Sequence, residues 1–239
     1  MCEGNFKCMK KKRVVKDPPT STEEKVVKKS AFFGCGVAVK ALRVGFEKVI
    51  TQHTDVLFTS RLMRAAVQTY QMDQLGELSE KSIFFSRHRW FLSKIEFDIK
   101  GKDLDMFMHK FDFAYSESRV EATLILNEFQ IKGINFPKGA THYQFVHHLC
   151  IISDYVYSKI SQKYEPLSEL SGMNASVCSE KIPVGDIFTG SLPVSFPEGT
   201  VLSDADSVIQ SVGVNFLIRS GPGGFMYIRG GGIKIVDVY

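Results

Sequence analysis

The stretch Phe91–Lys100, FLSKIEFDIK, marks the position at which the apolar pattern of this chain changes its period. Before it, apolar residues recur every three or four positions, which is typical of amphipathic helices. From Ile95 onward they recur at every second position, which is typical of strands with one buried face. The sequence therefore predicts an α+β protein: an N-terminal helical hairpin followed by an antiparallel β-sandwich.

A first helix is predicted over residues 22–50. Ser21 and Glu24 form a capping-box pattern directly after a pair of prolines, which a helix cannot cross. Four apolar residues at three- and four-residue steps share one face: Val39, Leu42, Phe46 and Val49. Gly34–Gly36 interrupts the pattern and is expected to bend or split the helix.

A second helix is predicted over residues 55–72. Thr54 is expected to cap its start, and Gly76 lies where a helix stop is expected. Its apolar stripe is expected to contain Thr59, Met63, Ala66 and Tyr70. Residues 77–92 form a weaker third helical candidate. A short link between the first two helices favours an antiparallel hairpin.

Downstream of Ile95, short alternating segments separated by turn residues predict the strands of a sandwich. They lie at 95–99, 111–115, 120–126, 143–151 and 208–218. The glycine clusters at 221–224 and 230–232 are expected to form turns that flank short strands. Residues 164–206 are expected to form a long loop with short strands near Ile182 and Val194.

These patterns divide the chain into a flexible basic arm at 1–20, a helical region at 21–92 and a β-sandwich domain at 93–239. The first 30 residues carry nine basic and four acidic side chains, whereas the remainder carries 21 basic and 22 acidic ones. A concentrated basic arm attracts phosphates, an anionic membrane or an acidic partner. The alternative is a solvated tail that binds nothing, which is the usual explanation for a run of charged residues.

The candidate contacts for an anion or a nucleic acid are Lys10, Lys11, Lys12, Arg13, Lys16, Arg87 and Arg89. The segment Arg87–Phe91 combines cations with aromatic rings, which can hold phosphates and stack on bases. A packing interpretation is favoured for this segment, in which the arginines face water while Trp90 and Phe91 pack inward.

The sequence contains no recognisable catalytic motif. Neither the GxSxG elbow of hydrolases nor the GxxxxGK[ST] phosphate loop occurs. His142 and His148 are expected on one face of a strand, with His147 on the other. Histidines six residues apart on a strand are separated by roughly 20 Å, which is too far to share a metal ion. The prediction is a protein that is not an enzyme, with no catalytic residue, no cofactor and no metal site.

Five cysteines lie at wide spacings, without a CxxC pair: Cys2, Cys8, Cys35, Cys150 and Cys178. This pattern is typical of a reducing compartment. The N-terminus lacks the apolar segment of a signal peptide, and no apolar run approaches 18 residues. The expected location is the cytoplasm or an assembled particle, with no signal peptide and no membrane insertion.

Several stretches spread over residues 17–239 also match segments of other proteins, and they occur in the same order there. They are Asp17-Pro18, Lys29–Gly36, Leu42-Arg43, Thr59–Met63, Ile95–Asp98, Pro137–Tyr143 and Ile233–Val238. Together they resemble an uncharacterised family of Bacteroidota proteins. The resemblance implies a layout of helices followed by strands, and it implies no activity or site residue. Members of that family start with a glycine-rich, β-like segment, whereas this chain starts with a short arm that contains cysteines and lysines.

These observations favour a non-enzymatic structural or assembly protein. It is expected to self-associate as a homo-oligomer, or to dock on a protein partner, through the helical arm and a sheet edge. The alternative is a nucleic-acid-binding or virion-type particle protein that uses the basic N-terminal arm. A third hypothesis, an enzyme with a cross-strand histidine site, has no motif in its support.

Overall fold

A computed structural model describes residues 22–74, 76–77, 80–98, 111–130 and 136–239. For residues 22–31, 51 and 52 only the backbone is described. The predicted basic arm, including the candidate contacts Lys10, Lys11, Lys12, Arg13 and Lys16, therefore lies outside the described residues.

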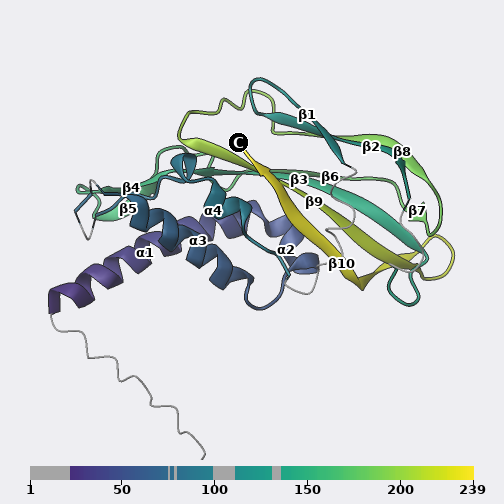
Figure 1. The fold of residues 1–239 in the computed structure, drawn as a ribbon, viewed down its shortest axis with the longest axis horizontal. Coiled ribbons are helices and arrows are strands. Elements are labelled where there is room, and N and C mark those ends of the chain that lie inside the picture. The colour runs from purple at the N-terminus through teal and green to yellow at the C-terminus, as the bar shows by residue number, and fades with distance from the viewer. Residues whose placement is uncertain (1–21, 75, 78–79, 99–110, 131–135) are drawn as a thin grey trace, which may run out of the picture.

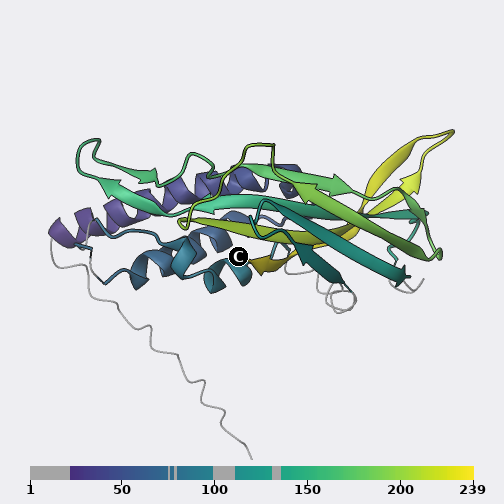
Figure 2. The ribbon, with the colours of Figure 1, turned by 90° about the horizontal axis from the view of Figure 1, so that it is seen from above.

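The molecule has three layers, with helices on one face of a central sheet and a smaller sheet on the other face (Figures 1 and 2). The helices are α1 (Thr22–Gly45), α2 (Glu47–His53), α3 (Phe58–Met72), η1 (Phe85–Arg87) and α4 (Trp90–Ser93). The predicted combination of an N-terminal helical layer with an antiparallel β-sandwich is confirmed by this arrangement.

The central sheet is antiparallel and has the strand order β10-β9-β3-β6, with β7 also paired to β3. Its strands are β3 (His142–Ser153), β6 (Asn174–Cys178), β7 (Ile182–Pro183), β9 (Asp206–Arg219) and β10 (Phe225–Val238). Because β3 and β9 lie between the other two layers, nearly every residue of both strands is buried. This double burial explains why apolar side chains occupy both faces of the two strands, although several polar side chains are buried with them.

The smaller sheet has the order β1-β2-β8 and is antiparallel throughout. Its strands are β1 (Asp112–Tyr115), β2 (Glu121–Phe129) and β8 (Phe188–Ser195). A separate hairpin pairs β4 (Tyr155–Ser158) with β5 (Lys163–Pro166) and packs beside α1. There a Cβ added to Gly34 would meet the Tyr164 ring at 2.6 Å, so the glycine permits the close contact.

Alternating side chains of β3 supply two separate cores. Val146, Cys150 and Ile152 point toward the helices and join a cluster that contains Leu42 and Phe46 of α1–α2. Tyr143, Phe145 and Leu149 point toward the smaller sheet, with apolar side chains of β2 and β8. The helical region and the sheet are thus held together by one continuous apolar cluster.

The first helical segment differs from its prediction in the position of its break. The helix continues through Gly34–Gly36 and ends at Gly45, and α2 starts after Phe46. Phe46 is fully buried and contacts the rings of Phe58 and Phe97. Packing therefore places the break where an aromatic anchor enters the core, while the predicted inward face is confirmed.

The second helix also differs at its start. Thr54 does not cap α3, because its hydroxyl donates to the Ile50 carbonyl of the preceding helix. Asp55 instead accepts the Leu57 amide at 2.8 Å. The buried stripe of α3 is also rotated relative to the prediction, since Thr59 is exposed. Its buried residues are Phe58, Leu62, Ala65, Ala66, Thr69 and Tyr70.

Two predictions for the β region were wrong in detail. Residues 164–206 were predicted as a long loop with short strands near Ile182 and Val194. These two strands are confirmed as β7 and β8, but the segment also contains β6 and part of β5, so it is not mainly a loop. The turn predicted at 230–232 is a register shift inside the single strand β10. Glycine permits this irregularity, because a Cβ on Gly231 would overlap the Val214 carbonyl.

Candidate functional site: the outer face of the helical layer

The outer face of α1 keeps large apolar side chains in solvent. Phe32 is 62% exposed, Phe33 is 60% exposed and Val44 is 46% exposed. On the opposite side of the same helix, Val39 and Leu42 are almost completely buried against the rest of the molecule. Helix α1 is therefore apolar on both sides, although only one side has a partner within the described structure.

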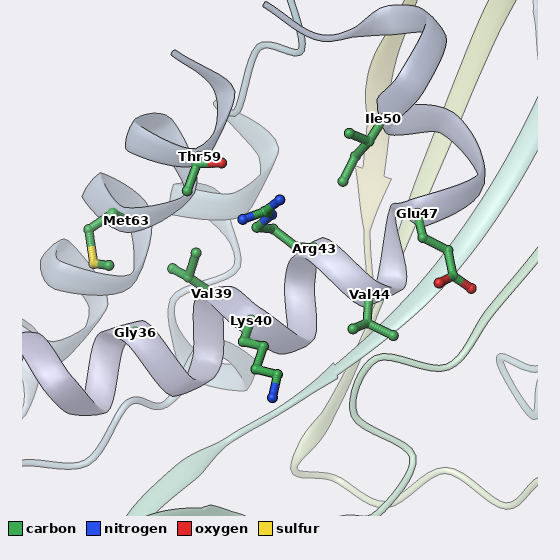
Figure 3. A pocket seen from close by; sticks show the side chains of 9 residues that line it. All are labelled: Gly36, Val39, Lys40, Arg43, Val44, Glu47, Ile50, Thr59 and Met63. Atoms are coloured by element: carbon green, nitrogen blue, oxygen red, sulfur yellow. The ribbon is translucent and has the colours of Figure 1, made fainter. Parts of the chain in front are cut away.

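A groove of about 550 Å³ opens beside these residues (Figure 3). Helix α1 contributes Gly36, Val39, Lys40, Arg43 and Val44 to its lining. Helix α2 contributes Glu47 and Ile50, and helix α3 contributes Thr59 and Met63. The floor is mostly aliphatic and the rim is charged, which is a common composition for a site that binds another polypeptide.

Two cations flank the groove. In Figure 3, Arg43 projects from α1 into the space between Thr59 and Ile50, while Lys40 projects to the other side of the helix. Within the described part of the chain, neither cation has a hydrogen bond or an ion pair. The nearby carboxylate of Glu47 does not pair with either of them and instead accepts a long hydrogen bond of 3.4 Å from the Asn174 amide. Because neither cation is paired there, both are available to an anionic partner.

Gly36 leaves one end of the groove open. A Cβ built at this position meets no atom within 4 Å, and its backbone φ does not require glycine. Glycine in a helix interior lowers helix stability relative to alanine. Gly34 has a structural reason in the contact with Tyr164, but no contact of this kind accounts for Gly36. Its visible effect is to expose the backbone of α1 to whatever occupies the groove.

Of the candidate anion contacts, only Arg87 and Arg89 lie in the described residues. The Arg87 guanidinium lies 4.3 Å from the centre of the Phe84 ring, and Arg89 Nε donates to the Ser207 hydroxyl at 3.3 Å. Both therefore make contacts within the fold. Burial raises the pKa of the nearby Asp154, and the two arginines partly offset this rise.

The packing interpretation of the neighbouring aromatic residues is correct for one of them. Phe91 packs against the helix–sheet core, as predicted. Trp90 remains 44% exposed and makes an edge contact with the His88 ring. A tryptophan at the start of the one-turn helix α4 has too few neighbours to be covered fully.

A buried polar cluster lies beneath α2, between the helices and the central sheet. His148 and Ser211 face each other across β3 and β9, and Gln144 faces Asn215 in the same way. His53 of α2 completes the cluster. A histidine beside a serine hydroxyl can serve as a general base. All five side chains are more than nine-tenths buried, however, so substrate cannot reach them in this arrangement.

His147 faces the other way, as the strand pattern predicted, and its hydrogen bonds join the two sheets. Its Nδ1 donates to the Leu192 carbonyl of β8 at 2.7 Å, and its Nε2 accepts from the Gln210 amide of β9 at 2.9 Å. Both bonds suit the neutral ring. Burial lowers the pKa of His147, and it lowers the pKa of His148 to about 3.

The described residues give little support for a metal site or a reactive thiol. No group of three or more His, Cys, Asp or Glu side chains there could hold a metal ion. Cys35 and Cys150 are buried, and burial raises the pKa of the Cys35 thiol to about 12. The third described cysteine, Cys178, is exposed. No helix among these residues has both the length and the apolar character to cross a membrane.

Comparisons with protein-family models, with curated proteins and with solved structures gave no match. The functional argument therefore depends on the geometry of this chain. Sequence reasoning missed the groove, although its lining includes one signal that was available. From the sequence, Gly36 is interpreted as an interruption of the helix. It can also mark an open position on the helix surface, but that interpretation requires knowing which side of α1 faces solvent.

Proposed function

We propose that this chain is a non-enzymatic structural or assembly protein that self-associates, or docks on a protein partner, in the cytoplasm or in an assembled particle. The observation that carries the proposal is the exposed apolar surface of α1 beside the groove. Phe33 and Val44 lie on the outward side of that helix, and Phe32 adjoins them. Exposed large apolar side chains with charged residues among them are a common feature of protein interaction sites.

A sheet edge offers a second contact for the same role. Strand β10 forms one edge of the central sheet, and its outer side carries the isolated bridge between Lys234 and Glu96. The β9–β10 hairpin, yellow in Figure 2, extends beyond the smaller sheet, and its residues Met226 and Tyr227 are more than half exposed. An open edge of this kind can pair with a strand from another chain.

The nucleic-acid alternative has weaker support from the described residues. Arg87 and Arg89 are engaged with Phe84 and Ser207, and the lysine-rich arm lies outside the described chain. The exposed surface beside the groove is aliphatic and phenylalanine-rich, whereas single-stranded nucleic acid prefers aromatic rings within a strongly basic channel. A protein partner fits this composition better.

Light scattering coupled to size exclusion tests self-association across about a hundredfold range of concentration. The wild-type mass is expected to rise above the monomer value of 26.9 kDa as concentration increases. The double variant Phe33→Glu with Val44→Glu is expected to stay monomeric, because it places charge on the contact surface. A matched variant on the far side of the molecule, Ile187→Glu with Val201→Glu, is expected to behave as the wild type; both residues are exposed.

A wild-type protein that remains monomeric over the whole range removes the self-association part of the proposal. Docking on another chain then has to be supported by the peptide experiment below. If that experiment also fails, the proposed function is wrong. An increase in mass that survives the Phe33 and Val44 substitutions would move the contact to the β10 edge.

A further inference from the structure

We infer that the groove formed by α1, α2 and α3 binds an acidic amphipathic helix of another protein. The inference rests on the proposed function and specifies its partner. Helices commonly bind in such grooves through apolar side chains at i, i+3, i+4 and i+7, with charged residues at the rim. The arguments come from the shape of the groove, its apolar floor and its charge.

The shape argument concerns Gly36. Because nothing lies within 4 Å of the position of its missing Cβ, this glycine relieves no crowding inside the molecule. It does permit an incoming segment to approach the α1 backbone closely. Small residues at a helix surface allow close contact between two helices. The stability cost of glycine at this position is explained if a partner helix crosses α1 there.

The floor has the length and composition that a helix requires. Its α1 part runs from Gly36 to Val44, which is eight helical steps, or about 12 Å, and matches about two turns of a partner helix. Val44, Ile50 and Met63 supply aliphatic surface to the groove, whereas Val39 is only 4% exposed. None of the lining residues is aromatic, which disfavours stacking of nucleic-acid bases.

The charge argument selects the class of partner. Lys40 and Arg43 lie three residues apart on α1, both line the groove, and neither has a partner among the described residues. Lys48 on α2 adds a third exposed cation nearby. Glu47 is the one acidic residue in the groove lining, against two basic ones, so the groove has an excess of positive charge. Carboxylates on a partner helix would pair with these cations.

Fluorescence anisotropy with two synthetic peptides and the full-length chain tests the inference. Both peptides carry leucines at helical i, i+3, i+4 and i+7 spacing, and they differ only in having Glu or Lys at the flanking positions. The Glu peptide is expected to bind about tenfold more tightly than the Lys peptide to the wild-type protein. This preference is expected to weaken as salt concentration rises.

Two variants locate the binding site. Lys40→Glu with Arg43→Glu is expected to reverse the preference, so that the Lys peptide binds more tightly than the Glu peptide. Gly36→Leu is expected to weaken binding of the Glu peptide by about tenfold, because the new side chain fills the groove. The control Lys138→Glu with Arg229→Glu makes the same change of charge at two exposed residues outside the groove and is expected to keep the wild-type preference.

Equal binding of the two peptides, or an unchanged preference in the Lys40 and Arg43 variant, would overturn the inference. A Gly36→Leu variant that loses self-association instead of peptide binding would assign the groove to a second copy. Self-association of the wild type without peptide binding would leave the proposed function in place and remove this partner alone. Circular dichroism of each variant verifies that the helical content is retained.

Discussion

At the scale of single residues, the three buried histidines of the helix–sheet–sheet stack determine how the protein responds to acid. Burial lowers the pKa of His53 to about 4 and that of His148 to about 3, and it also lowers the pKa of His147. Each ring is therefore neutral in the folded chain at neutral pH. The ordinary value of 6.5 applies when the chain unfolds and the rings reach water.

The free energy of unfolding is expected to fall as the pH drops below 6.5, the ordinary pKa of these histidines. Below that pH the unfolded chain binds protons at histidines that the folded chain keeps neutral, so protonation favours unfolding. Each such histidine contributes a slope of about 1.4 kcal/mol per pH unit until the pH reaches its folded pKa. For His148 that window extends down to about pH 3. Urea unfolding at a series of pH values measures the slope.

The variant His148→Leu isolates the contribution of one ring. It is expected to reduce the slope by about one proton between pH 6 and pH 4. Phe46→Leu is the matched control, because Phe46 contacts the His148 ring at a centroid distance of 5.7 Å and does not titrate. That control should lower stability by about 1 kcal/mol at every pH without a change in slope. A wild-type slope in His148→Leu would contradict the assignment.

At the scale of elements, Arg61 of α3 connects the helical layer to the segment that leads into the β region. Its guanidinium pairs with Asp55 at 2.8 Å and 3.1 Å. It also donates to the carbonyls of Glu96 and Phe97, at 2.5 Å and 2.7 Å. One side chain therefore fixes the start of α3 and the crossing near Phe97. The side chain is only 13% exposed, which limits screening by solvent.

Arg61→Ala is expected to lower the free energy of unfolding by about 2 kcal/mol, because it leaves two carbonyls and a carboxylate without their charged donor. Arg61→Lys is expected to recover only part of this loss, since an ammonium group cannot reproduce the planar set of donors. Chemical unfolding at neutral pH measures both variants.

The control for Arg61 is Lys159→Ala. Lys159 pairs with Glu80 at 3.2 Å on the surface, and its side chain is 74% exposed. Solvent-exposed pairs of this kind contribute little to stability, so no measurable change is expected. If Lys159→Ala lowered the free energy of unfolding as much as Arg61→Ala, burial would not explain how much each pair contributes to stability.

At the scale of the whole molecule, the central sheet is covered on both faces, whereas the smaller sheet is covered on one face. Strands β3 and β9 also have hydrogen-bonded neighbours on both sides. Opening them requires loss of both the helix–sheet core and the core between the sheets. We infer that the most stable part of the fold is this pair of strands.

Amide hydrogen exchange is expected to be slowest in the middle of β3 and β9, around Phe145–Ile151 and its β9 partners. The edge strand β1 is expected to exchange at least about a hundredfold faster. Strand β2 is the internal control, because it has neighbours on both sides yet belongs to the smaller sheet. Exchange in β1 as slow as that in β3 would refute the proposed order of stabilities.

The sequence predicted the features that depend on the local spacing of apolar residues. The inward face of residues 39–49 followed from a period of 3.6, and the shared face of the odd-numbered residues at 143–151 followed from a period of 2; both are confirmed. The opposite orientation of His147 and His148 followed from the same rule. Such patterns survive in the fold because burial selects apolar side chains at fixed spacings along an element.

Only the tertiary structure decided the features that depend on contacts between distant segments. The break at Phe46 depends on rings from Phe58 and Phe97, and the continuous strand β10 depends on its pairing with β9. The groove depends on which side of α1 the sheet leaves uncovered. Periodicity determined that this chain would join helices to an antiparallel sandwich. Long-range packing determined which surface remained open, because burial of one helix face is settled by partners that the helix sequence does not contain.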